Sequence, residues 1–540
     1  MNFPLSIGIS LLAGLAQACA IATPWSGHPL WWLQILSLAL LVALLHGAGT
    51  VRRAAALGWV FAIAWLVGCT WWLYISMHTY GGLAAPLAAA AVLALSAFLA
   101  SYYAAGCAAY FWIFKANVTA ISSYRAIYLG ILFAALWTLA ELARNDWFTG
   151  FPWGAGGYAH VDGPLAAWAA QVGVYGVGAA AALLATWGAW SAASLWGLLP
   201  VGRARVGVTS LPRLAGRLLA LTVCAATVFI AAPAMQNLWP IDSISSAKTQ
   251  VALLQGNIPQ GEKFDNSKGV PFALEWYSVQ LRASTATLTV APETAIPVLP
   301  KQLPPEYWDA ISDKFAIGKQ AALIGVPMGS YEKGYTNSVL GLQPKAVPYV
   351  YAKHHLVPFG EFIPPLFKWF TRLMNIPLGD FNRGAVGQAS FAFAGQRWAP
   401  NICYEDLFGD ELAARFIDPA TAPTVLVNMG NIGWFGNSIA IDQHLHISRM
   451  RTLEFGRPML RATNTGPTVI IDHLGRVTAS LPRHTRGALL GEVEGRTGIT
   501  PFAWWAARYG LLPVWVLCFV ILLIAGYDRM TLTLGRKTVN

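Results

Sequence analysis

Eight long apolar runs constrain the fold of this chain more than any other feature of its sequence. A helix needs about 20 mostly apolar residues to cross a bilayer. Only 11% of the chain is charged, against roughly 25% in soluble proteins. The sequence therefore predicts a membrane α-helical bundle of eight transmembrane helices. The runs cover residues 5–22, 30–49, 54–76, 82–114, 126–143, 164–199, 216–234 and 510–527.

Basic residues gather in alternate loops between these runs. The loops 23–29 and 78–81, which lie between the basic ones, contain no Lys or Arg. By the positive-inside rule, both termini are expected in the cytoplasm, and residues 235–505 on the outer face of the membrane. The first run has no basic start, so it is expected to remain a span and not to be a cleaved signal peptide. The basic loop residues are Arg52, Arg53, Lys115, Arg125, Arg203, Arg205, Arg213, Arg217, Arg529, Arg536 and Lys537.

The pattern divides the chain into three parts. We expect a membrane domain of seven helices at 1–234, a soluble domain at 235–505, and an eighth helix with a cytoplasmic tail at 506–540. In the soluble part, short β-like runs alternate with helical segments, which favours an α/β layered domain. The expected strands are 250–255, 287–291, 321–326, 338–342, 347–352, 399–403, 424–428 and 469–472, and the expected helices are 272–285, 305–320, 408–417 and 440–456.

The net charge of +11 is not a sign of nucleic-acid binding. Between residues 235 and 505 the chain has 23 basic and 21 acidic side chains, which nearly cancel. Most of the excess therefore lies in the basic loops of the membrane part, where orientation explains it. We expect the membrane as a partner and no nucleic acid.

Cys403 is the one cysteine in the long soluble stretch, because the other five lie in apolar runs. A lone thiol there has no soluble partner for an internal disulfide. It is therefore either an inert packing residue or a nucleophile, and the residue alone leaves both readings open. The five cysteines of the apolar runs are Cys19, Cys69, Cys107, Cys224 and Cys518.

Two other reactive side chains stand, like Cys403, at the end of a strand-like run. Glu293 follows 287–291, and Lys353 follows 347–352. In α/β sheets the strand ends are where ligands meet side chains. A carboxylate can take the proton of a thiol, and an ammonium can stabilise a tetrahedral oxyanion. Together the three predict an acyl-transfer site that works through a covalent thioester, although a surface position is the ordinary alternative for a glutamate or a lysine.

Three segments around these residues resemble the signature blocks of the nitrilase, or carbon–nitrogen hydrolase, superfamily. Their wording, above all Lys353-His-His-Leu-Val-Pro-Phe-Gly-Glu361, is similar to that of the bacterial apolipoprotein N-acyltransferase family. With further matching segments, the resemblance covers nearly the whole chain. The three blocks are Ala291-Pro-Glu293-Thr-Ala-Ile-Pro297, Tyr351-Ala-Lys353-His-His-Leu-Val-Pro-Phe-Gly-Glu361 and Asn401-Ile-Cys403-Tyr-Glu405, and the further matches include Gln255-Gly-Asn-Ile-Pro259, Arg461-Ala-Thr-Asn-Thr-Gly466 and Thr149-Gly-Phe-Pro-Trp153.

The resemblance implies both a fold and a reaction. It implies an αββα sandwich for the soluble domain, with Glu293 as general base, Lys353 as oxyanion stabiliser and Cys403 as nucleophile. It implies a ping-pong transfer of the sn-1 acyl chain of a phospholipid, expected to be phosphatidylethanolamine, to the N-terminal amine of a diacylglyceryl lipoprotein. It implies no cofactor and no metal, in an enzyme of the bacterial inner membrane whose soluble domain is periplasmic. We expect a monomer.

Three more residues match positions that the family needs near the site. Glu361 matches a second glutamate, although after Pro-Phe-Gly it could simply fix a turn. Tyr404 and Glu405 match the two residues that follow the nucleophile. Tyr404 could act by packing alone, and Glu405 could orient Lys353 or meet the substrate.

Four aromatic side chains are candidate lipid contacts. Two lie in the apolar stretch 362–374, which we predict to be a hydrophobic arm that touches the bilayer, although it could be core. Another stands where family members often have Trp, directly after Lys263. The last lies in Asn431-Ile-Gly-Trp-Phe-Gly436, which lacks the acid of the usual family wording. The four are Phe264, Trp369, Phe370 and Trp434.

Other functions and sites were weighed against this one. A membrane-tethered amidase or nitrilase would use the same three residues, with water as the acceptor. A non-catalytic transporter or scaffold would tolerate replacement of Cys403, but the few charges within the spans show no ion path. His444 and His446 are two residues apart on a predicted helix and do not share a face, so no metal site is expected.

Overall fold

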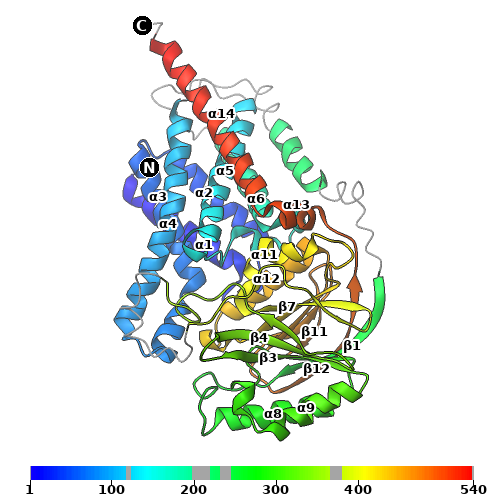
Figure 1. The fold of residues 1–540 in the computed structure, drawn as a ribbon. Coiled ribbons are helices and arrows are strands. Elements are labelled where there is room, and N and C mark those ends of the chain that lie inside the picture. Colours follow the sequence, from blue (N-terminus) through cyan, green and yellow to red (C-terminus); the bar gives the residue numbers. More distant parts are fainter. Residues whose placement is uncertain (1, 117–122, 197–218, 232–244, 365–379, 538–540) are drawn as a thin grey trace. The chain divides into compact units, whose positions relative to one another are not determined.

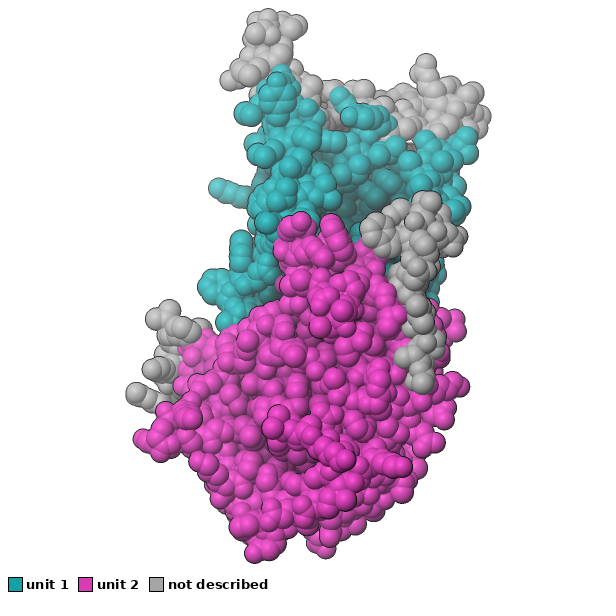
Figure 2. Space-filling model, turned by 45° about the vertical axis from the view of Figure 1, so that its right-hand side comes forward, with its two compact units in different colours: residues 1–71, 89–240, 511–540 teal, residues 72–88, 241–510 magenta. Residues whose placement is uncertain are grey.

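The computed structural model describes residues 2–116, 123–196, 219–231, 245–364 and 380–537. Contacts divide the chain into two compact units, which Figure 2 colours separately. The first unit holds Met1–Trp71, Ala89–Pro240 and Leu511–Asn540, and the second holds Trp72–Ala88 and Ile241–Gly510. The second unit therefore combines the long soluble stretch with residues 72–88, which include the end of the third predicted span and the start of the fourth.

The first unit is built from helices (Figure 1). Long helices suit apolar sequence because every interior backbone group is bonded within the segment. Some starts carry polar caps: Thr50 accepts a hydrogen bond from the Arg53 N–H at 3.2 Å and so begins the third helix. The helices are α1 (Phe3–Ile21), α2 (Trp31–His46), α3 (Val51–Thr70), α4 (Ala85–Ala116), α5 (Ser123–Asp146), α6 (Ala169–Trp196) and α14 (Leu512–Lys537), with short turns η2 (Trp147–Thr149), η3 (Gly156–His160) and η4 (Pro164–Trp168) before α6.

The prediction of eight spans is an overstatement. In the part of the chain that the structure describes, six helices are long and apolar enough to cross a membrane. Two apolar helices are shorter, α2 with 16 residues and Leu219–Ala231. A helix of the length of α2 extends about 24 Å at 1.5 Å per residue, which is less than the ~30 Å of a bilayer core. The predicted run 30–49 is longer than α2 because its last residues, which include Gly47 and Gly49, do not belong to the helix.

Two six-stranded sheets form the centre of the second unit. The first has the strand order β12-β1-β2-β3-β4-β5, and the second has β11-β10-β9-β8-β7-β6. In each sheet the inner strands are parallel and the outer ones antiparallel. The strands are β1 (Ser245–Gln255), β2 (Leu288–Ala291), β3 (Ala321–Ser330), β4 (Gly334–Leu342), β5 (Tyr349–Ala352), β6 (Phe391–Phe393), β7 (Gln396–Ile402), β8 (Val425–Gly430), β9 (Met459–Thr463), β10 (Thr468–Ile471), β11 (Val477–Leu481) and β12 (Gly487–Arg496).

The sheets face each other across one buried core and carry helices on their outer faces (Figure 1). Leu253 and Leu323 of the first sheet and Val427 of the second belong to the core between the sheets. Helices α8 (Gly269–Ala283) and α9 (Pro305–Ile317) pack on the first sheet, for example through Tyr277 and Ile311. Helices α11 (Gly409–Ala413), α12 (Ala440–Phe455) and α13 (Pro501–Tyr509) pack on the second. The predicted αββα sandwich is therefore confirmed.

Candidate active site

The three predicted site residues each stand directly behind a strand. Glu293 follows β2 by one proline, Lys353 follows the last residue of β5, and Cys403 follows the last residue of β7. β2 and β5 belong to one sheet and β7 to the other, so the site is assembled from both sheets of the sandwich. The structure brings these three residues together, as the distances and charge interactions below establish.

Glu293 is a buried carboxylate, 8% exposed, with fixed partners on both oxygens. Asn337 donates its side-chain N–H to Oε1 at 2.7 Å. The main-chain N–H of Asn431 donates to Oε2 at 2.9 Å. The residue that follows, Thr294, has a left-handed backbone with φ 47°. These contacts fix the direction of the carboxylate before any substrate binds.

Lys353 lies between two carboxylates. Its Nζ is 2.8 Å from Glu361 Oε2 and 3.6 Å from Glu293 Oε1. Burial lowers the pKa of Lys353, but the charges of Glu361 and Glu293 outweigh burial and raise that pKa above its ordinary value. The ammonium is therefore charged at neutral pH, as an oxyanion stabiliser must be.

Cys403 begins the 3₁₀ turn η6 (Cys403–Leu407) in a left-handed backbone conformation, with φ 52°. Such a conformation costs a non-glycine residue about 1–3 kcal/mol and persists only where the surroundings hold it. Burial, together with the negative charge of Glu293, raises the pKa of the Cys403 thiol to about 12, although Lys353 and the Asn431 N–H act in the opposite direction. At neutral pH the residue is a thiol, so a nucleophilic role needs a base beside it.

Glu405 organises the main chain around Lys353 and Cys403. Its carboxylate accepts from the Tyr351 hydroxyl at 2.8 Å, from the His354 N–H at 2.6 Å and from the Ile402 N–H at 2.6 Å. Of the two roles considered for this residue, orientation of the Lys353 segment fits these contacts. Burial raises the pKa of the Glu405 carboxyl, and its hydrogen bonds and Lys353 oppose this.

Glu361 and Tyr404 also lie near the site. Glu361 accepts from Asn337 at 2.7 Å and from the main-chain N–H of Val357 at 2.8 Å, so it fixes a turn and pairs with Lys353 at the same time. Tyr404 is buried, and its ring lies 5.3 Å from that of Phe408. Tyr404 therefore packs against Phe408 beside the site.

A buried polar network contacts the carbonyl oxygen of Cys403. Asn428 donates to this carbonyl oxygen at 3.1 Å, and His444 lies 3.2 Å from it. His444 in turn contacts Asp406 at 2.8 Å and Arg461 at 2.7 Å. The sequence did not predict this network, because its residues come from four separate elements. His444 was considered only as a metal ligand, and Arg461 only as the start of a segment that matches the family.

The loop after β8, residues 431–436, packs on the segment Trp72–Ala88 within the second unit. The Trp72 indole donates to Gln443 Oε1 at 3.1 Å, and its ring centroid is 4.2 Å from that of Phe435. The rings of Tyr80 and Trp434 meet edge to face at 5.9 Å. The same loop supplies the Asn431 N–H to Glu293, so the aromatic packing of the loop helps to position that carboxylate.

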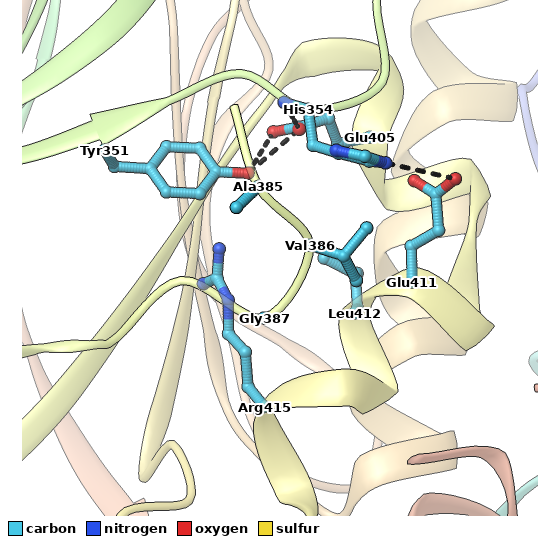
Figure 3. Close-up of a pocket in the computed structure, with 9 residues that line it drawn as sticks. All are labelled: Tyr351, His354, Ala385, Val386, Gly387, Glu405, Glu411, Leu412 and Arg415. Atoms are coloured by element: carbon cyan, nitrogen blue, oxygen red, sulfur yellow. Dashed lines mark hydrogen bonds and ion pairs between the residues drawn. The ribbon is translucent and has the colours of Figure 1, made fainter. Parts of the chain in front are cut away.

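A small pocket lies next to Glu405 (Figure 3). The Arg415 side chain points toward Tyr351 and Glu405, and its guanidinium lies 4.8 Å from the Tyr351 ring centroid. His354 Nε2 is 3.9 Å from Glu411 on the other side of the pocket. Glu293, Lys353 and Cys403 do not line it. The lining residues are Tyr351, His354, Ala385, Val386, Gly387, Glu405, Glu411, Leu412 and Arg415.

The four predicted lipid contacts have different outcomes. Trp369 and Phe370 lie outside the described residues. Trp434 is half-buried against Tyr80, as given above, and Phe264 is half-buried in the turn before α8. Lipid contact by either of these two stays a prediction.

Sequence reasoning missed Asn337 and Lys263 as site residues. Asn337 joins the two carboxylates that flank Lys353. Lys263 is buried and donates to the main-chain oxygen of Glu293 at 3.0 Å. The pairing of β4 with β5 places Asn337 beside Lys353, and a register prediction for that hairpin would have found it.

Comparison with known proteins bears on both units. The family model of the apolipoprotein N-acyltransferase N-terminal domain matches residues 13–187, and that of the carbon–nitrogen hydrolase matches residues 250–500. Among solved structures, the carbon–nitrogen hydrolase from Helicobacter pylori G27 aligns with 49% of this chain and 94% of that chain, at 14% identity and a TM-score of 0.34.

Curated relatives match over nearly the full length. A protein named apolipoprotein N-acyltransferase from Verminephrobacter eiseniae is 57% identical, covering 93% of this chain and 92% of its own. Relatives of the same name from Ralstonia nicotianae and Bordetella bronchiseptica are 45% and 41% identical, covering 87% and 96% of this chain and 85% and 96% of their own. On this similarity, which extends through the membrane helices as well as the sandwich, the chain belongs to the apolipoprotein N-acyltransferase family.

Proposed function

We propose that this protein is an apolipoprotein N-acyltransferase that works through a thioester on Cys403. The observation that supports this most is the arrangement of Glu293, Lys353 and Cys403. Glu293 is a buried carboxylate with a fixed direction, Lys353 is a charged ammonium, and Cys403 is a thiol that needs a base. Family membership supports lipid and lipoprotein substrates in a bacterial membrane.

In the proposed first step, Glu293 accepts the proton of the Cys403 thiol as Sγ attacks the sn-1 ester carbonyl of a phospholipid. Lys353 stabilises the negative charge on the carbonyl oxygen. The bond between the carbonyl carbon and the glycerol oxygen then breaks, and the departing oxygen takes the proton from Glu293. The products are a thioester and a lysophospholipid, for which phosphatidylethanolamine is the expected donor.

In the proposed second step, the N-terminal amine of a diacylglyceryl lipoprotein attacks the thioester. Glu293 accepts a proton from the amine, the carbon–sulfur bond breaks, and the Cys403 thiolate takes that proton back. The product is an amide, and the enzyme returns to its starting state. Two substrates that bind in turn at one nucleophile give ping-pong kinetics.

The proposed location follows from the basic loops. Loops with Lys and Arg alternate with loops that lack them, which favours cytoplasmic termini and a periplasmic sandwich on the inner membrane. It also favours the division into a membrane domain at 1–234, a catalytic domain at 235–505 and a last span with a tail at 506–540. We propose that the protein acts as a monomer.

Intact mass spectrometry of the purified protein tests the proposal. After incubation with phosphatidylethanolamine, wild-type protein should gain the mass of one acyl chain, and Cys403→Ala should not. A diacylated lipopeptide should then remove the added mass and appear acylated itself. An adduct that only water removes would favour the membrane-tethered amidase or nitrilase. No adduct on folded wild-type protein would overturn the proposal.

A further inference from the structure

Lys263 is a buried ammonium group beside the site, with little to offset its charge. It is 1% exposed. Within the part of the chain that the structure describes, its Nζ makes one hydrogen bond, to the neutral main-chain oxygen of Glu293 at 3.0 Å, and no ion pair. A buried charge without a counter-ion is costly, and proteins keep one mainly where it acts on another charge.

The contrast with Lys353 is informative. Lys353 has two carboxylates within ion-pair distance, and their charges raise its pKa. For Lys263 burial dominates and lowers the pKa to about 8, although the charges of Glu293 and Cys403 act in the opposite direction. The ammonium of Lys263 is therefore less stable alone than in the presence of a thiolate at Cys403.

The charges around Cys403 bear on the ionisation of its thiol. Three buried carboxylates, those of Glu293, Glu361 and Glu405, surround the site, and Lys353 lies between two of them. When Glu293 takes the thiol proton, one negative charge passes from Glu293 to Cys403. Lys263 and Arg461 are two further buried cations whose charges act on Cys403.

Lys263 also contacts the catalytic carboxylate segment through the main chain. The oxygen that it binds belongs to Glu293, at the point where the chain turns into the left-handed conformation of Thr294. A hydrogen bond to this carbonyl holds the turn and therefore the direction of the Glu293 side chain. The contact is close to the proposed base without touching its carboxylate.

Building on the proposed function, we infer that Lys263 is a further positioning residue of the acyl-transfer site. Its ammonium holds the Glu293 turn and supplies a further positive charge that favours the Cys403 thiolate. This positive charge lowers the free energy of ionising the Cys403 thiol. Before the thiolate forms, the buried ammonium of Lys263 is only partly compensated and destabilises the folded protein.

The test is the rate at which iodoacetamide alkylates Cys403 in the full-length protein in detergent, measured from pH 6.5 to 9.5. The rate follows the thiolate fraction. Lys263→Met should lower it about tenfold or more below pH 8, because loss of a unit charge that acts on Cys403 in a low-dielectric site has an effect of that order. Above pH 8 the wild-type residue loses its own charge, so the ratio between the two rates should shrink. Lys268→Met, which removes an exposed lysine five residues away, is the matched control and should resemble wild type.

Lys263→Gln separates the charge from the hydrogen bond, because glutamine can still donate to the Glu293 oxygen. It should be as slow as Lys263→Met. If Lys263→Gln alkylates at the wild-type rate, or if both variants do, the inference is wrong. Methionine in place of an unpaired buried charge is expected to be neutral or stabilising, so failure of both variants to fold would show a structural role and also overturn it.

The alkylation assay uses no lipid, so it reports on Lys263 whatever the acyl-transfer assay gives. Wild-type protein that gains an acyl chain while Lys263→Met alkylates normally would contradict the inference alone. Wild-type protein that never gains an acyl chain would contradict the proposed function alone.

Discussion

His444 lies 3.2 Å from the carbonyl oxygen of Cys403 through its Nε2, and 2.7 Å from Arg461 through its Nδ1. Arginine can only donate, so Nδ1 must accept and Nε2 must carry the proton. Burial and the charge of Arg461 lower the pKa of His444, although Asp406 acts in the opposite direction, so the ring is neutral at neutral pH. The Nε2–H therefore donates toward Cys403 and Asp406, and it helps to hold the left-handed backbone of the proposed nucleophile.

We expect His444→Gln to destabilise the sandwich and to slow acylation of Cys403. Asp406 and Arg461 would each lose a buried partner, which costs about 1–3 kcal/mol for an unsatisfied group. Thermal unfolding in detergent and the initial rate of the acyl mass gain are the measurements. His484→Gln, which changes an exposed ring, should alter neither. Unchanged unfolding temperature and rate in His444→Gln would mean that the network does not hold the nucleophile.

Glu361→Gln should slow formation of the acyl-enzyme at least tenfold. It removes the closer carboxylate of Lys353 and leaves Glu293, 3.6 Å away, as the remaining one. Lys353 would then shift toward Glu293, whose carboxylate must stay free to take a proton. Single-turnover mass spectrometry measures the rate, and Glu332→Gln, an exposed change, is the control. A wild-type rate in Glu361→Gln would mean that Glu361 fixes the turn and does not assist acylation.

Trp72→Leu should lower the acylation rate several-fold while the protein stays folded. The substitution removes the hydrogen bond to Gln443 and the ring contact with Phe435, and so loosens the loop that supplies the Asn431 N–H to Glu293. Trp71→Leu is the matched control, because Trp71 is the preceding residue and 45% exposed. Equal rates for the two variants would show that this packing does not reach the site.

The stability of the protein should depend on pH through Lys263. Its pKa is lowered by burial to about 8 in the folded chain, against an ordinary value of 10.5. Between these values the unfolded chain binds the extra proton, so stability should rise with pH. Below about pH 8 the folded protein carries the full free-energy penalty of burying the Lys263 ammonium. The unfolding temperature of wild type should therefore rise relative to that of Lys263→Met between pH 8 and 10. A constant difference between the two unfolding temperatures across this range would contradict the lowered pKa of Lys263.

Local signals predicted the α/β layering and the three reactive strand ends, and the family resemblance implied the sandwich that the structure has. The eight expected strands were all found, since Val, Ile, Leu and Tyr dominate these short runs and Gly, Pro or Asn end many of them. Four more, β6, β9, β11 and β12, were not predicted. β11, for example, has exposed and half-buried residues in place of a continuous apolar run, so its sequence lacks the signal.

The supporting residues were out of reach for a different reason. Asn337 and Arg461 matter through contacts with residues 13 or more positions away, and the family match of the segment that Arg461 opens gave this residue no role. Lys263 was noticed only as the residue before Phe264. Its role depends on being buried, and a lysine is so rarely buried that sequence favours the surface.

β1 and β12 pair antiparallel along their length, from Ser245 opposite Arg496 to Gln255 opposite Gly487. The chain therefore begins and completes the first sheet on hydrogen-bonded neighbours, and α13 then packs on the second sheet. A module with adjacent ends can be inserted into a host sequence without stretching either partner, which is how domain insertion is tolerated. Because these two strands pair, a host sequence could be joined to both ends of the two-sheet core side by side, provided that α13 stays with the sandwich.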